Sequence, residues 1–121
     1  MLAGMSPSVV VQRIVPDLTC RSVPESTRFY ADVLGLRVVM DHGWIVTLGT
    51  PSAQLSLISH DATAPMPPAV SVEVADVDAA YAAAVAHGAE IVHPLTDEPW
   101  GVRRFFLRDP DGHVVNVLGH A

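Results

Sequence analysis

The stretch Glu98–Phe106 holds the residues best suited to contact a small molecule. It combines a tryptophan, two arginines and two phenylalanines within nine positions. Side chains alternate along a strand, so Arg104 and Phe106 share one face. Arg103 and Phe105 share the other. An arginine can pair with a carboxylate or polarise a carbonyl, and an aromatic ring can stack on a flat ligand. The competing interpretation places both phenylalanines in the core and both arginines in surface ion pairs.

Polar side chains also occur inside segments that are typical of strands. Such side chains are costly in an apolar core but suit the wall of a wet binding site. Trp44 could line the mouth of that site, although Val46 and Leu48 share its parity and favour core packing. Trp100 belongs to the distinctive stretch above. The polar strand residues are Asp17, Thr47, Gln54, Ser56, Ser71 and Asn116.

Other reactive residue types give no catalytic pattern. The histidines show no HxH or HExxH spacing, and most are expected in turns or at strand ends in structural or surface roles. For His42 and His113, the sequence does not decide between such a role and metal binding. Glu73 and Glu90 are strand carboxylates expected to face solvent, and no Ser-His-Asp or Cys-His arrangement occurs. Cys20 cannot form an internal disulfide, and a buried strand position is favoured over a reactive thiol. The histidines are His42, His60, His87, His93, His113 and His120.

The elements that would position these residues follow the same order twice. In the first half, Val9–Cys20 predicts a strand, and Ser22 with Glu25 predicts a helix start that runs to Gly35. The apolar spacing within that helix is carried by Thr27, Phe29, Tyr30, Val33 and Leu34. Three short strands follow, over 37–40, 44–48 and 54–59.

The second half repeats this plan after a proline-rich linker at 61–68. Val70–Val74 predicts a strand, and a helix begins at Asp76 and ends at Gly88. Further strands are expected from Ala89 to His93, then at 103–108 and 114–118, with a loop at 94–101. We therefore predict one domain over 1–121, with a first βαβββ module at about 9–60 and a second at about 69–118.

Composition limits the function classes. The 121-residue chain is 50% hydrophobic and 17% charged, which is typical of a compact fold. Its formal net charge is −6, and no Lys/Arg cluster suits a nucleic acid. The start of the sequence lacks a signal-peptide pattern, and no run of about 18 apolar residues occurs. We expect a cytoplasmic protein with no nucleic-acid or membrane partner.

Several short motifs in this duplicated chain resemble a known superfamily. Phe29-Tyr30, Val33–Leu36 and Asp109–Gly112 resemble the FY…LG and DPxG signatures of the vicinal oxygen chelate superfamily, which includes glyoxalases, bleomycin-resistance proteins and dioxygenases. The resemblance covers about residues 9 to 118. It implies an α+β fold in which two βαβββ modules form curled mixed sheets around a cleft, usually completed in a homodimer.

The resemblance also implies a divalent metal in catalytic members, held by His, Glu or Gln from both modules. Counting from the motifs places the corresponding positions at Val15, Ser56, Ala69 and Asn116. Aliphatic side chains cannot bind a metal, and neutral Ser and Asn oxygens are weak ligands for the metals used by this fold. We therefore expect neither a metal nor another cofactor.

Three functions are compatible with this resemblance. The first is a bleomycin-resistance-like protein that binds an antibiotic or aromatic metabolite in the cleft without metal. Parity with related resistance proteins selects Arg104 and Phe106 as cleft residues. The alternative is an enzyme, either a lyase, isomerase or dioxygenase with rearranged metal ligands, or a metal-independent one with Arg104 and Asn116 as oxyanion donors. A regulatory module without chemistry is the third.

Overall fold

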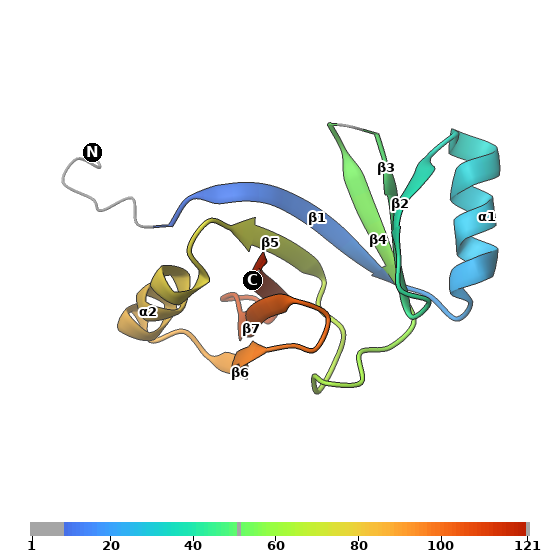
Figure 1. The fold of residues 1–121 in the computed structure, drawn as a ribbon. Coiled ribbons are helices and arrows are strands. Elements are labelled where there is room, and N and C mark those ends of the chain that lie inside the picture. Colours follow the sequence, from blue (N-terminus) through green and yellow to red (C-terminus); the bar gives the residue numbers. More distant parts are fainter. Residues whose placement is uncertain (1–8, 51, 121) are drawn as a thin grey trace. The chain divides into compact units, whose positions relative to one another are not determined.

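The computed structural model describes residues 9–50 and 52–120, and its elements follow the βαβββ order twice (Figure 1). The predicted α+β class and its two modules are confirmed. None of the helices in the described part of the chain is long and apolar enough to cross a membrane. The elements are β1 (Val11–Thr19), α1 (Val23–Leu34), β2 (Arg37–Asp41), β3 (Ile45–Gly49), β4 (Gln54–Ile58), β5 (Val70–Val74), α2 (Val77–His87), β6 (Ile91–Asp97), β7 (Val102–Arg108) and β8 (Val114–His120).

The chain folds into two compact units that do not coincide with a simple division at the linker. One unit is Val15–Ser71, and the other joins the chain up to Ile14 to the chain from Val72 onward. The Asp17 N–H donates to the Ala69 carbonyl at 2.9 Å within the first unit. In the other unit the Ala75 N–H donates to the Val10 carbonyl, also at 2.9 Å. Strands β1 and β5 therefore each contribute residues to both units.

In the Val15–Ser71 unit, the strands follow the order β2-β3-β4-β1, and β1 runs parallel to β4. Helix α1 begins where Ser22 Oγ accepts from the Glu25 N–H at 3.2 Å. It ends at Gly35, whose φ of +70° is the left-handed conformation that glycine adopts most readily. Both ends agree with the prediction. The core of this unit joins Val23 of α1 to Val46, Leu48 and Leu57 of the sheet.

The apolar spacing of α1 is only partly used in this core. Tyr30 packs against the core cluster together with Cys20, which lies half-buried just after β1. Phe29, Val33 and Leu34 are each more than half exposed. The helix therefore presents an apolar surface that its own unit does not cover.

In the other unit, β5-β8-β7-β6 is the strand order, and β6, β7 and β8 are antiparallel neighbours. Asp76 Oδ1 accepts from the Ala79 N–H at 3.0 Å, and Gly88 ends α2 with a φ of +82°. The core lies between α2 and the sheet. It is formed by Val74, Val77, Ala80, Phe105 and Val117.

Strand β6 extends further than the sequence predicts. It continues through Pro94 to Asp97, where a loop was expected. Proline lacks the N–H that a central strand donates, but β6 is the last strand in the order and can tolerate it. The pairing with β7 is irregular between Ile91 and His93 and again between His93 and Thr96. The edge position and these irregularities accommodate Pro94.

Candidate functional site

Strand alternation separates two sets of side chains on the β6-β7-β8 sheet. Phe105 and Val117 face α2 in the core, so Arg104 and Asn116 lie on the opposite surface, here called the helix-distal face. Phe106 lies on that face directly across from Asn116. All three of these helix-distal side chains are buried. The predicted grouping of Arg104 with Phe106 agrees with this arrangement.

Phe105 and Arg103 have structural roles, as expected if phenylalanines fill the core and arginines form surface ion pairs. Phe105 contacts Tyr81 of α2 edge to face, with ring centroids 5.0 Å apart. Arg103 forms exposed ion pairs with Asp78 at 3.0 Å and with Asp97 at 3.1 Å. The hydrogen bond to Asp78, followed by that to Asp97, raises the pKa of Arg103 above its ordinary value. This surface network fixes the start of β7 without contributing to the helix-distal face.

Arg104 is the centre of a buried charged group. Its residue is 3% exposed, and its Nε donates to Glu98 Oε2 at 2.6 Å. The guanidinium carbon lies 5.0 Å from the Trp100 ring centroid and 4.8 Å from that of Phe106. Both distances are suited to cation–π attraction. Three predicted residues, Trp100, Arg104 and Phe106, thus lie together.

His93 completes this group from strand β6. Its Nε2 lies 3.1 Å from Glu98 Oε2, the same oxygen that Arg104 binds. Its ring meets that of Phe106 at a centroid distance of 5.2 Å and an angle of 62°. We call His93, Glu98 and Arg104 the Glu98 cluster. The sequence analysis did not select His93 or Glu98, because neither has a motif spacing and their approach depends on the β6–β7 turn.

A second polar group occupies the helix-distal face of the other unit. Val46, Leu48 and Leu57 face α1, which leaves Thr47 and Ser56 on the opposite surface. Their hydroxyl oxygens are 2.7 Å apart. The β1 residue paired with Ser56 is Asp17, whose Oδ2 accepts from Ser71 Oγ at 2.7 Å. We call Asp17, Thr47, Ser56 and Ser71 the polar row.

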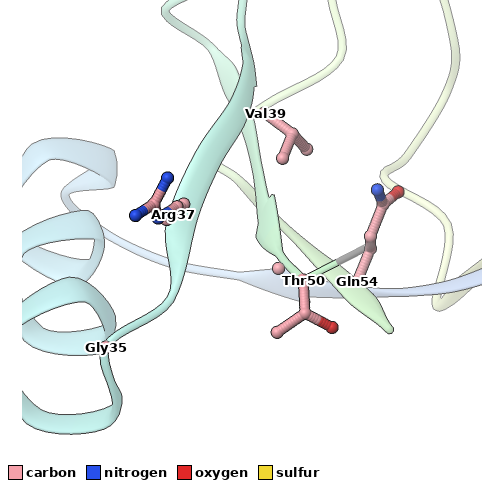
Figure 2. A pocket seen from close by; sticks show the side chains of 6 residues that line it. Gly35, Arg37, Val39, Thr50 and Gln54 are labelled. Atoms are coloured by element: carbon pink, nitrogen blue, oxygen red, sulfur yellow. The ribbon is translucent and has the colours of Figure 1, made fainter. Parts of the chain in front are cut away.

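Gln54 and Trp44 lie outside these two groups. Gln54, at the start of β4, borders an open hollow of about 500 Å³ beside the β3–β4 turn, and Thr50 lies next to it (Figure 2). The other residues around this hollow are Gly35, Arg37, Val39 and Gly49. Trp44 precedes β3 and is half-buried, with its ring 6.5 Å from that of His60.

The residues at the implied metal positions do not fit a divalent metal. Val15 and Ala69 carry no donor atom on their side chains. The Ser56 hydroxyl is already bonded to Thr47, and a neutral hydroxyl is a weak ligand. Asn116 offers only an amide. The donor set of this chain therefore does not support the family's metal chemistry.

Where the structure describes them, the remaining ionisable residues form no other metal site. Within residues 9–50 and 52–120, no three His, Cys, Asp or Glu side chains gather closely enough to hold an ion. Glu73 is partly buried and interacts with Arg13 at 2.9 Å and His120 at 3.4 Å, whereas Glu90 forms an exposed pair with Arg108. Glu90 therefore faces solvent as expected, and Glu73 does so only in part.

Several solved structures share this fold. A Legionella pneumophila chain described as NAD-dependent benzaldehyde dehydrogenase aligns with a TM-score of 0.76 and 17% identity, covering 90% of this chain and 100% of that chain. A glyoxalase/bleomycin resistance protein/dioxygenase superfamily member from Vibrio splendidus gives 0.68 and 21%, with coverages of 93% and 100%. Methylmalonyl-CoA epimerase from Mycobacterium tuberculosis gives 0.68 and 17%, with coverages of 97% and 93%. At these identities the likeness shows the fold alone.

Sequence comparison supplies the family. No curated protein sequence matches this chain significantly. The family model of the Glyoxalase/Bleomycin resistance protein/Dioxygenase superfamily matches residues 10–117. This match spans both modules and both of the motifs that carry the resemblance. The chain therefore belongs to the glyoxalase/bleomycin resistance protein/dioxygenase superfamily, whose fold its two βαβββ modules adopt.

Proposed function

We propose that this chain binds a small molecule, such as an antibiotic or an aromatic metabolite, on the helix-distal face of the β6-β7-β8 sheet and without a divalent metal. The observation that supports this most is the burial of polar and charged side chains on the faces that carry no helix. Burying such groups is costly when they serve only to fill a core. A site for a polar ligand gives these residues a function.

The Glu98 cluster and its aromatic neighbours supply the recognition chemistry in this proposal. Arg104 offers a planar donor group, and Trp100 and Phe106 offer apolar surface. Trp100 is only partly buried, so it marks the side from which a ligand would reach the buried members. In the other unit, Asp17 and the hydroxyls of the polar row offer hydrogen bonds to a separate ligand.

Ligand-dependent thermal stabilisation tests this proposal. Protein purified without a His tag is expected to contain no stoichiometric metal by elemental analysis, and its Tm should rise with some members of an antibiotic and aromatic panel. Arg104→Gln should abolish that rise, whereas Arg103→Gln, which alters only a surface network, should retain it. Stoichiometric metal would contradict the metal-free proposal, and a panel that stabilises neither the wild type nor Arg103→Gln would contradict ligand binding.

We also propose that the protein forms a homodimer. The exposed apolar side chains of α1, together with Val38 and Val39 of β2, support this proposal because such surfaces favour association. Val33→Glu is expected to shift the sedimentation coefficient from dimer to monomer. Val85→Glu, at a similarly exposed position on α2, should not. A monomeric wild type would contradict the proposal.

A further inference from the structure

The hollow beside the β3–β4 turn is lined by a row of residues that crosses three strands. Arg37 of β2 pairs with Gly49 of β3, and Gly49 pairs with Gln54 of β4. Leu48 and Leu55, which alternate with Gly49 and Gln54 along their strands, pack on the α1 side of the sheet. The row therefore lies on the helix-distal face of this unit, and all three of its members line the hollow of about 500 Å³.

Arg37 gives the hollow a positive charge that has no counter-charge within the described part of the chain. Its residue is exposed, and among residues 9–50 and 52–120 its guanidinium forms no ion pair or hydrogen bond. The arginines that do form ion pairs are Arg13, Arg103, Arg104 and Arg108. The sequence holds 13 acidic residues against 7 basic ones, yet none of the described carboxylates meets Arg37. This guanidinium is therefore open to an anion from outside the chain.

The rest of the wall is apolar or neutral. The pairing of β2 with β3 shifts between Val38 and Met40, which leaves Val39 as an extra residue whose half-exposed side chain lines the hollow. Thr50 and Gln54 add a neutral hydroxyl and a neutral amide beside the turn (Figure 2). No aromatic ring or carboxylate occurs among the described residues that line it. This wall suits an anion with a short aliphatic body, because a flat aromatic ligand would find no ring to stack on.

We propose that this hollow is a binding site of its own, which takes a short aliphatic carboxylate. A carboxylate matches the planar guanidinium of Arg37 through a pair of parallel N–H groups, and Val39 would contact the aliphatic chain. All the lining residues belong to the Val15–Ser71 unit. The site is therefore separate from the face that carries Arg104, and it does not depend on the function proposed above.

Hexanoate and hexanamide are matched probes, because they share an aliphatic chain and differ in the charge of the head group. In proton–nitrogen-15 correlation NMR, hexanoate should shift the amide resonances of Gly49 and Thr50 and the Nε–H resonance of Arg37. We expect hexanoate to bind about tenfold more tightly than hexanamide, the scale of one charge-assisted hydrogen bond. Added salt should reduce this preference, because the guanidinium is exposed. Equal binding of the two probes would overturn the inference.

Variants separate a specific contact from a change in net charge. Arg37→Gln should lower the affinity for hexanoate to that for hexanamide, and Arg37→Lys, which keeps the charge without the planar fork, should retain part of the preference. Arg28→Gln is the control, since Arg28 is exposed on α1, lies outside the hollow and likewise forms no ion pair with the described residues. An equal loss in Arg28→Gln and Arg37→Gln would overturn the inference.

Two further variants distinguish this site from the proposals made above. Arg104→Gln should leave the hexanoate titration unchanged, and a hexanoate response that follows Arg104 instead of Arg37 would contradict a separate site. Val33→Glu, the variant expected to be monomeric, should bind hexanoate as the wild type does, because one chain supplies every lining residue. Loss of binding in Val33→Glu would show that a single chain does not form the site.

Discussion

Glu98 keeps a negative charge almost out of contact with water. Its side chain is 3% exposed and that of Arg104 is 4% exposed. Desolvating two charges costs several kcal/mol per ion, and their attraction offsets this cost only where geometry and hydrogen bonding are good. Glu98 Oε2 is bonded to both Arg104 and His93, and the rings of Trp100 and Phe106 flank the Arg104 guanidinium. This arrangement meets that condition. The group is thus stable as a whole and sensitive to the loss of one member.

Replacing Glu98 should therefore be strongly destabilising. We expect Glu98→Gln to lower the free energy of unfolding by about 3 kcal/mol, because Arg104 would remain buried without its counter-charge. Urea denaturation measures this loss. Glu90→Gln is the control, since it breaks the exposed pair with Arg108 and should cost less than about 1 kcal/mol. Equal losses in the two variants would show that burial does not strengthen the Glu98 interaction.

Asp109 gives the DPxG turn a pH-dependent stability. Its Oδ1 accepts from the N–H groups of Asp111 and His113, and its Oδ2 meets the His113 ring at 2.8 Å. Loss of hydration acts to raise the pKa of Asp109, but these hydrogen bonds, led by that from the His113 backbone, together lower it below the ordinary 3.8. The carboxylate therefore stabilises the fold above the unfolded-state pKa and loses this effect as pH falls through the folded value.

Asp109→Asn should consequently lower the urea midpoint at pH 7, and the difference from the wild type should shrink as pH falls below about 4. Asp111→Asn removes the same charge from the same turn and serves as the control, with a small change expected at every pH. A deficit in Asp109→Asn that persists unchanged at pH 2 to 3 would point to altered turn geometry instead of charge.

Alternation alone was enough to group Arg104 with Phe106, because side-chain direction in a strand follows from sequence position. Glu98 could not be assigned in the same way. Its contact with Arg104 depends on how the turn between β6 and β7 folds, and no local spacing rule describes that turn. His93 likewise reaches Glu98 across an irregular stretch of β6.

The β3–β4 hairpin depends on one close approach of its backbone. A Cβ atom on Gly49 would collide with the Ala53 carbonyl oxygen and lie 2.8 Å from the Gln54 Cα atom. Neither atom can move without shifting the hairpin. Because Gln54 borders the hollow in Figure 2, the same shift would change that surface.

Gly49→Ala should therefore lower the free energy of unfolding by about 2 kcal/mol, the scale of overpacking in a tight site. Thermal unfolding followed by circular dichroism measures it. Gly119→Ala is the control, since its nearest heavy atoms would lie 3.5 Å away, an ordinary contact distance. A Tm for Gly49→Ala at or above that of Gly119→Ala would mean that the hairpin backbone can shift to accommodate the added Cβ atom without loss of stability.

Elements with local signals were predicted well. The cap residues Ser22 and Asp76 and the terminal glycines Gly35 and Gly88 lie where the sequence indicates, because capping depends on neighbouring residues. The predicted end of the strand at His93 was wrong, because β6 continues through Pro94. A proline is tolerated there only because β6 lies at the edge of the sheet. Position in a sheet is a tertiary property, so the sequence of the segment does not contain it.

Strand β1 links the stability of the two units. It contributes Val11–Ile14 to one unit and Val15–Thr19 to the other. A destabilising change at this boundary should therefore lower the stability of both units. We expect Val15→Ala, at a buried position, to cost about 2 kcal/mol and to increase amide hydrogen exchange in both β3–β4 and β7–β8. Ile14→Ala, at an exposed position, should have little effect. Faster exchange confined to one hairpin would argue against this linkage.

The sharing of β1 also has a consequence for how the chain can be divided. A cut within the linker at 61–68 would separate Asp17 from its backbone partner Ala69, and Ala75 from its partner Val10. Each fragment would then carry a strand segment that the other fragment needs to complete its sheet. The two halves would be a complementing pair, suited to a split reporter that folds when its fragments meet.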